Sequence, residues 1–331
     1  MLREIRLGTR GSRLALWQAE AVAGRIAAVG GPPCRIVTIK TSGDRLQDAS
    51  LASAGGKRLF VKEIEDALLS GEIDIAVHSS KDMPVVLPEG LVIGGVLPRE
   101  DPLDAVVLPR PAFAPPPPRP AQVAVSSLDH LVTHLGRSPS IGTSSVRRIA
   151  QLTRIFPGGR FVPIRGNLDT RLRKLDEGAP HGNDALVLAA AGLRRLGFGD
   201  RIGMALPATV CVPAPGQGIV AIETREDNEP VRRILARIDE PRAAAALRAE
   251  RAVVVALGGG CQTPIGALAL ASDDGGLALI AAVVALDGSR VIRAEERGTI
   301  LEAEALGSRV GASLRADGAD EILGEVRRAQ G

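Results

Sequence analysis

Short β-like runs alternate with amphipathic helical segments through the first hundred residues, and this alternation restricts the chain to an α/β architecture. The run "EIRLG" leads to Ser12, which can cap a helix that carries Leu14 and Ile26 on one face. The strand-like "RIVTIKT", the helical "FVKEIEDALLSG" and the buried-strand pattern "IDIAVHS" follow. We therefore expect a layered α/β domain.

The same alternation returns after a proline-rich stretch. Six prolines lie between Arg110 and Pro120, which excludes a core helix or strand there, and we expect a surface insertion over residues 110–138. Beyond it, "SIGT", "RFVPIRG" and "DALVLAAAG" are strand-like, while "SSVRRIAQLTRIF" and "TRLRKLDEG" are helical. The pattern predicts a second α/β domain, and two such domains commonly bind a ligand between them.

From about Glu229 the pattern changes to α+β. Two helices, "EPVRRILARI" and "PRAAAALRAERAVVVAL", precede strands that are separated by the turn sequences "DDGG" and "DGSR", and a final helix is expected over residues 302–316. This predicts a third domain, in which "GGGCQTPIG" forms the loop between the long helix and the first strand.

Composition disfavours several classes of protein. The longest strongly apolar run, 278–286, is far shorter than the roughly 20 residues of a membrane span, and "MLREIRLGTRGS" lacks the apolar stretch of a secretory signal. We expect no membrane association and a cytoplasmic location. A net charge of +3, 2% aromatic residues and no Tyr disfavour nucleic-acid binding. The three cysteines lack C-x-x-C spacing, so we expect free thiols.

Arginine is the dominant cation, because only five of the 41 basic residues are lysines. A GC-rich coding bias and selection for guanidinium–carboxylate pairing explain this excess of arginine equally well. The positions of the arginines in the sequence therefore have to decide between the two explanations. Arg147 and Arg148 stand in the first turn of a predicted helix, a favourable place for an anion. Other arginines follow strands, at the sheet edge where α/β proteins bind ligands: Arg165, Arg171, Arg194 and Arg195. Together they predict a polycarboxylate or phosphate ligand.

Lys81 and Asp82 directly follow a buried strand, again at a ligand edge. Taken alone, the pair is more typical of a capped turn. In a cationic cleft, however, a single carboxylate can stabilise a developing positive charge that arginines cannot.

Cys261 follows three consecutive glycines, so its thiol should be accessible. It can be an ordinary loop residue. The absence of a nearby Cys-His pair argues against a protease-like nucleophile and leaves attachment or metal-free thiol chemistry.

Two further motifs resemble ligand-binding motifs but do not meet their requirements. "GGKRLFVKE" fails the G-x-x-x-x-G-K-[ST] spacing of a phosphate loop, so we reject P-loop nucleotide binding. His130 and His134 have i, i+4 spacing but lack the Glu of H-E-x-x-H, and an exposed helix is the better interpretation. We predict no metal.

The assembled motifs resemble the porphobilinogen deaminase (hydroxymethylbilane synthase) family. The matching segments, in family order, are "GTRGSRLALWQA", "GGKRLFVKE", "DIAVHSSKDMP", "PREDPLDA", "IGTSSVRR", "RGNLDTRL", "LAAAGLRRLG", "PAPGQG" and "GGGCQTPIG". The resemblance implies a dipyrromethane cofactor bound to Cys261 through a thioether. It also implies that four porphobilinogen molecules are condensed head to tail onto this cofactor with loss of ammonia, and that hydrolysis then releases hydroxymethylbilane.

The resemblance assigns roles to individual residues. Asp82 matches the catalytic aspartate, which is expected to hydrogen-bond pyrrole N–H groups and to stabilise the cationic azafulvene formed on deamination. Lys81, the second expected catalytic residue, is expected to assist in holding the carboxylates. Lys57 and Phe60 match the family's mobile loop, where Arg58 stands in place of a small residue. The residues expected to hold the acetate and propionate groups of cofactor and substrate are Arg10, Ser12, Arg147, Arg148, Arg165, Arg171 and Arg195.

The implied fold has two α/β domains like those of type-2 periplasmic binding proteins and a small α+β domain that carries the cofactor. The expected boundaries are 1–99 with about 219–236, about 104–212, and about 240–331. We expect a monomer that acts on the small molecule porphobilinogen. The rival hypothesis is a non-catalytic two-lobed anion-binding protein, for which the third domain and Cys261 would have no purpose.

Overall fold

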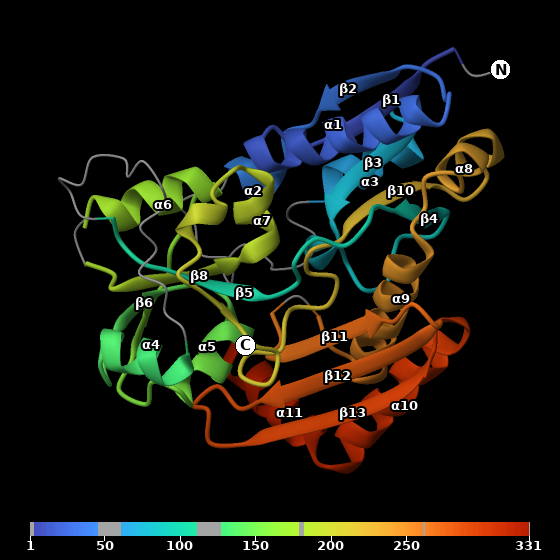
Figure 1. Cartoon of the computed structure of the whole chain (residues 1–331). Coiled ribbons are helices and arrows are strands. Elements are labelled where there is room, and N and C mark those ends of the chain that lie inside the picture. The colour runs from blue at the N-terminus through green and yellow to red at the C-terminus, as the bar shows by residue number, and fades with distance from the viewer. Residues whose placement is uncertain (1–2, 46–60, 111–126, 179–181, 261, 331) are drawn as a thin grey trace.

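The structure is a computed structural model, and it describes residues 3–45, 61–110, 127–178, 182–260 and 262–330. Figure 1 shows three units, the first mainly blue and cyan, the second green, and the third orange and red. Each unit is built on its own sheet. The predicted fold class, two α/β units and a smaller α+β unit, is confirmed.

The first sheet has the strand order β2-β1-β3-β10-β4. β1 is parallel to β2 and β3, whereas β10 is antiparallel to both of its neighbours. Apolar side chains of α1 and α8 cover one face and those of α3 the other. The strands are β1 (Ile5–Thr9), β2 (Cys34–Thr38), β3 (Ile75–Ser79), β4 (Leu91–Val96) and β10 (Val220–Arg225). The helices are α1 (Arg13–Ala28), α2 (Ser42–Arg45), α3 (Lys62–Leu69), α8 (Glu229–Leu235) and the short η1 (Ser80–Asp82).

The second sheet repeats this plan with the order β7-β6-β8-β5-β9, in which β5 is the antiparallel strand. Its strands are β5 (Asp104–Val107), β6 (Ser140–Gly142), β7 (Arg160–Val162), β8 (Ala185–Ala189) and β9 (Met204–Leu206). Its helices are α4 (Leu128–Leu135), α5 (Val146–Thr153), α6 (Leu168–Asp176), α7 (Ala190–Arg195) and η2 (Gly199–Arg201). The chain therefore crosses between the two units twice, from β4 to β5 and from β9 to β10.

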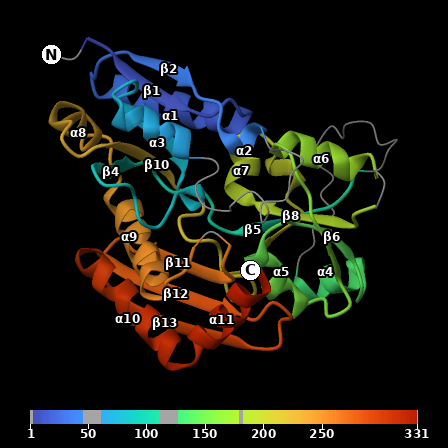
Figure 2. The same cartoon turned by 180° about the vertical axis from the view of Figure 1, so that it is seen from behind.

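The third sheet is antiparallel, in the order β11-β12-β13. Its strands are β11 (Ile265–Ala271), β12 (Gly276–Val284) and β13 (Val291–Thr299), and its helices are α9 (Pro241–Ala256), η3 (Ile300–Glu302), α10 (Ala303–Ala316) and α11 (Ala319–Gln330). Helices α9 to α11 share one core with the sheet. Figure 2, the view from behind, shows α9 running from the first unit toward this third unit.

Two sequence predictions need correction. The insertion predicted over 110–138 is too wide, because α4 lies within it and buries Leu131 completely in the core of the second unit. The expected final helix is followed by a second one, α11, after a turn at Gly318. Its buried Ile322 and Leu323 complete the third core. The proline run itself, residues 111–126, lies outside the described residues.

A buried ion pair joins the first crossing segment to the third unit. Arg99, which follows β4, donates to the carboxylate of Glu250 on α9, and Glu250 is completely buried. The same carboxylate accepts hydrogen bonds from the backbone N–H groups of Gly216 (2.6 Å) and Ala269 (2.7 Å). One side chain thus binds three separate segments of the chain.

Removal of the Glu250 carboxylate should destabilise the whole assembly. In Glu250→Ala, Arg99 is left as an unpaired, largely buried cation, and we expect the free energy of unfolding to fall by about 3 kcal/mol. Glu229→Ala is the matched control, because Glu229 pairs with Arg233 on the surface of α8 and should cost about 0.5 kcal/mol or less. Denaturant unfolding measures both, and equal losses would contradict this account of Glu250.

Candidate functional site

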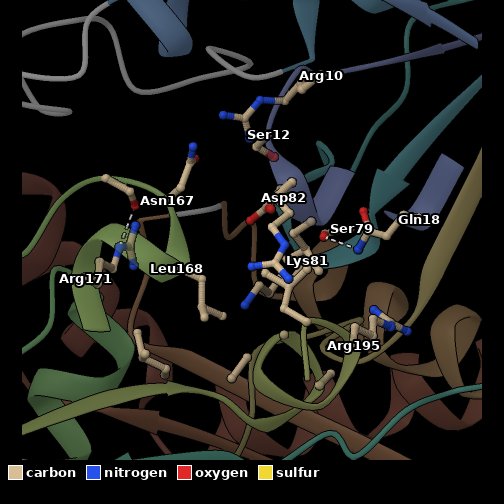
Figure 3. Close-up of a pocket in the computed structure, with 18 of the residues that line it drawn as sticks. Arg10, Ser12, Gln18, Ser79, Lys81, Asp82, Asn167, Leu168, Arg171 and Arg195 are labelled. Carbon is tan, nitrogen blue, oxygen red and sulfur yellow. Dashed lines mark hydrogen bonds between the residues drawn. The ribbon is translucent and has the colours of Figure 1, made fainter. Parts of the chain in front are cut away.

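A cavity of about 340 Å³ lies between the first two units, within the size range of small-molecule sites. Figure 3 shows basic side chains around it, with the Asp82 carboxylate directed into the open centre. The lining comes from the segments after β1, β2 and β3 of the first unit, from those after β6, β7 and β8 of the second, and from the crossing segment around Gly216. The ends of successive strands therefore meet at one place, as the sequence predicted.

Helix η1 carries Lys81 and Asp82 at the end of β3. Its flanks are fixed: Ser80 is buried and its N–H donates to the carbonyl of Ile219, while Met83 is buried on the other side. With both flanks held inward, the side chains of Lys81 and Asp82 face the cavity. Asp82 is exposed there and Lys81 is half-buried.

The "PGQG" turn fits tightly beneath η1. Gly216 and Gly218 have positive φ angles of 74° and 88°. A Cβ atom at Gly216 would meet the side chain of Ser80, and one at Gly218 would meet the carbonyl of Glu100. Only glycine satisfies both requirements, and the turn holds Gln217 fully buried between them.

Asp104, the first residue of β5, is a completely buried carboxylate beside the cavity. It accepts hydrogen bonds from Arg147 (2.7 and 3.2 Å), from Arg148 (2.7 and 2.9 Å) and from the Gln217 amide (3.0 Å). Burial acts to raise the pKa of Asp104, but the two guanidiniums outweigh it and hold that pKa well below its usual value. Two guanidiniums against one carboxylate leave a net positive charge under the site.

The thiol of Cys211 also lies against this cluster, 3.4 Å from a carboxylate oxygen of Asp104. Burial, followed by the charge of Asp104, raises the pKa of Cys211 to about 12. Cys211 is therefore a protonated, unreactive thiol, and it is free, as expected from the sequence.

Lys81 lies above this cluster. Its Nζ is 3.4 Å from the Oε1 atom of Gln217, whose amide nitrogen donates to the carbonyl of Pro102 (2.7 Å) and to Asp104. Burial lowers the pKa of Lys81 to about 8, Arg148 contributes in the same direction, and Asp82 opposes the shift. Lys81 remains a cation at neutral pH and becomes neutral in mildly alkaline solution.

The cavity arginines differ in how they are held. Arg10 is paired with Asp44. Arg171 donates to the carbonyl of Gly166 (2.8 Å) and Arg195 to that of Gly218 (2.7 Å). Among the described residues, no carboxylate lies within salt-bridge distance of Arg171 or Arg195.

The pKa values of these two arginines reflect their crowded surroundings. Burial lowers the pKa of Arg171, Arg148 adds to the effect and Asp82 opposes it. Burial also lowers the pKa of Arg195, against the attraction of Glu100. Both guanidiniums are therefore cations whose charge an incoming anion would stabilise.

The structure brings together most of the predicted site residues. Those that line the cavity are Arg10, Ser12, Lys81, Asp82, Arg148, Arg165, Arg171 and Arg195. Arg147 does not line it, because its guanidinium binds Asp104 and the carbonyl of Val212. Arg194 pairs with Asp101 outside the cavity. Lys57, Phe60 and Cys261 lie outside the described residues.

The predicted anion site at the start of α5 is partly filled by the chain itself. Ser145 caps the helix by accepting from the Arg148 N–H (3.4 Å), and the anion that Arg147 and Arg148 bind is Asp104. Sequence reasoning missed Asp104 and Gln217. The available signals were a carboxylate opening the apolar strand "DAVV" and an amide between two glycines. Ser12 caps α1 as predicted, accepting from the Ala15 N–H (3.3 Å).

The loop around position 261 is closed on both sides by described residues. Thr263 donates both its backbone N–H (3.1 Å) and its hydroxyl (2.6 Å) to the carbonyl of Gly260. A Cβ at Gly260 would have open space, whereas one at Gly259 would meet the side chain of Ile265.

The described ranges contain neither a membrane-spanning helix nor a cluster of metal ligands. No helix there combines the length and the apolar character that crossing a bilayer requires. No three His, Cys, Asp or Glu side chains in those ranges are grouped as metal ligands. His130 and His134 both lie exposed on α4.

The lowered pKa of Lys81 can be measured directly, because the chain has only five lysines. After reductive methylation with ¹³C-formaldehyde, we expect the dimethyl-Lys81 NMR signal to titrate near pH 8, well below the ordinary lysine value of 10.5. This signal should disappear in Lys81→Arg. A Lys81 signal that titrates near the ordinary value would contradict the burial of its ammonium group.

Two family models and the curated relatives all point to the same family, and the relatives cover nearly the whole chain. The family model "Porphobilinogen deaminase, dipyromethane cofactor binding domain" matches residues 5–233, and "Porphobilinogen deaminase, C-terminal domain" matches 244–316. The chain is 45% identical over 329 residues to porphobilinogen deaminase of Moorella thermoacetica, covering 99% of this chain and 98% of that one. It is 44% identical to that of Geobacter metallireducens (98% and 95% covered) and to that of Synechococcus elongatus (98% and 96% covered). The chain belongs to the porphobilinogen deaminase family.

Proposed function

We propose that this chain joins four molecules of porphobilinogen head to tail, with loss of ammonia at each step, and releases the linear tetrapyrrole hydroxymethylbilane by hydrolysis. The observation that carries the proposal is the Asp82 carboxylate, which is directed into the centre of a cavity whose lining includes six arginines and Lys81. A pyrrole with an acetate and a propionate needs that combination. Its carboxylates require cations, and its ring N–H requires an acceptor.

The chemistry of the cavity fits the family's dipyrromethane cofactor. A dipyrromethane has acidic side chains and two pyrrole N–H groups, and the cavity offers Arg148, Arg165 and Lys81 for the former and Asp82 for the latter. When bound, the cofactor supplies the pyrrole ring to which the first substrate is joined. We propose Cys261 as its attachment point, supported by the turn that Thr263 closes with Gly260 and by the open space beside Gly260.

The residues of the cavity have different tasks in this proposal. Arg10, Arg171 and Arg195 bind substrate carboxylates, Arg148 and Lys81 bind those of the cofactor, and Ser12 and Arg165 serve both. Arg147 acts indirectly, because it holds Asp104 in place and Asp104 in turn orients Arg148. Asp82 accepts the pyrrole N–H and stabilises the positive charge that develops on the ring as ammonia leaves.

A non-catalytic anion-binding protein is the weaker alternative. Two α/β units with arginines at strand ends would serve such a protein equally well. It would not require a carboxylate in the middle of the cavity, where a negative charge repels the anion, nor the match of residues 244–316 to the family's C-terminal domain. Family membership therefore favours the enzyme.

We further propose the domain boundaries 1–99 with about 219–236, about 104–212, and about 240–331, supported by the three separate sheets. We also propose that the protein is a cytoplasmic monomer, on the basis of two observations. Cys34 and Cys211 are free thiols, as is usual in reducing compartments, and one chain supplies the cavity lining from both units.

Intact-protein mass spectrometry tests the cofactor. We expect the purified chain to be heavier than its 34.4 kDa sequence by two linked pyrrole units, and we expect the extra mass on the peptide that contains Cys261. Cys261→Ser should remove it. An active preparation with an unmodified mass would exclude covalent attachment.

Replacement of Asp82 separates catalysis from binding. Asp82→Asn keeps the size of the side chain but removes the charge, so turnover of porphobilinogen should fall at least about 100-fold while the cofactor mass is retained. Asp129→Asn, on the exposed face of α4, is the matched control and should leave turnover unchanged. Near-normal turnover in Asp82→Asn would remove Asp82 from the mechanism.

A further inference from the structure

Trp17 on α1 lies against the guanidinium of Arg195 on α7. The Cζ atom of Arg195 is 5.5 Å from the centroid of the Trp17 ring, within the range of a cation–π interaction. Arg195 lines the cavity, whereas Trp17 is partly exposed behind it. The contact therefore joins the first unit to a cationic side chain that belongs to the second.

Arg195 is held differently from the paired arginines of the site. Arg10 and Arg148 are oriented by the carboxylates of Asp44 and Asp104, which occupy guanidinium N–H donors and offset the positive charge. Arg195 makes one hydrogen bond, to the carbonyl of Gly218, and no described carboxylate lies within salt-bridge distance of it. Its orientation depends on that carbonyl and on the indole face.

An aromatic face and a carboxylate orient a guanidinium with different consequences. The aromatic ring contacts the flat face of the cation, so the N–H groups at the edge stay available and the full charge remains. A carboxylate instead takes two edge donors and neutralises the charge. Stacking is thus the arrangement that fixes an arginine while leaving it able to bind an anionic ligand.

A second cation–π contact joins the same two units, but here the first unit supplies the arginine and the second supplies the aromatic ring. Arg13 of α1 lies over the ring of Phe198, which follows α7, with 5.6 Å between Cζ and the ring centroid. Between these two contacts Leu14 packs beside Gly192. The position of Trp17 relative to Arg195 is therefore set by an interface between the two units.

We propose that Trp17 is a positioning residue for Arg195: its indole face holds the guanidinium at the cavity wall with its N–H donors and its charge free for a carboxylate of the substrate. The effect on catalysis rests on the proposed function, while the contact itself does not. Trp17 touches no reacting atom in this assignment and acts only through Arg195.

Kinetics with two replacements of Trp17 test the catalytic consequence. Trp17→Leu removes the aromatic face and should raise the KM for porphobilinogen about fivefold to tenfold, with a much smaller change in kcat. Trp17→Phe keeps a ring and should recover most of the loss. Glu20→Ala, one turn away on the exposed face of α1, should behave as the wild type. Equal KM values for Trp17→Leu and Trp17→Phe, after both are shown to fold with wild-type melting temperatures, would overturn the proposal.

Fluorescence tests the contact without relying on activity. Trp17 is the only tryptophan of the chain, so its emission reports this position alone. We expect Arg195→Ala to change the intensity and the maximum of Trp17 emission in substrate-free protein, and Arg195→Lys to change them less. Identical spectra for wild type and Arg195→Ala would exclude the contact. A wild-type protein that does not consume porphobilinogen would overturn the proposed function, but the emission change would still establish the contact between Trp17 and Arg195.

Discussion

The buried carboxylate of Asp104 is the interaction on which the site depends. A carboxylate without exposure is tolerated only when it is paired and hydrogen-bonded, and Asp104 meets this requirement through Arg147, Arg148 and Gln217. Asp104 is the first residue of β5, and its partners come from two other segments, the first turn of α5 and the turn before β10. Because β5 and β10 begin at the two crossings between units, the network fixes the floor of the cavity at the point where the units join.

A second buried carboxylate couples this floor to the third unit. Glu250 accepts from the backbone of Gly216, and the next residue, Gln217, donates to Asp104. Two adjacent residues therefore connect the long helix α9 with the base of the cavity. The loop that contains residue 261 follows α9 directly, so an attached group would start from an element whose position is tied to the site.

Local rules predicted much of this architecture from the sequence. Strand alternation predicted the two α/β units, the capping preference of Ser12 predicted the start of α1, and the end of a buried strand placed Lys81 and Asp82 at the ligand edge. The features that the sequence patterns missed depend on partners that lie far away in the sequence. Arg147 lies in the expected helix turn, yet it faces away from the cavity because Asp104, 43 residues earlier, provides its counter-charge. A carboxylate at the start of the apolar strand "DAVV" is a local signal, but it does not show which arginines pair with Asp104. The core helix α4 was missed because the proline run beside it led us to assign residues 110–138 to a surface insertion.

Some arginines in and beside the cavity are paired with carboxylates and others with backbone carbonyls, and electrostatics explains the difference. If every guanidinium around the cavity were unpaired, mutual repulsion and desolvation would oppose folding, and the lowered pKa values of Lys81 and Arg171 show that both effects act here. Internal carboxylates neutralise part of the charge at Arg10, Arg147 and Arg148. Arg171 and Arg195 are held instead by backbone carbonyls and, for Arg195, by an aromatic face. The fold thereby limits repulsion at the paired arginines and keeps the full positive charge of Arg171 and Arg195 at the cavity wall.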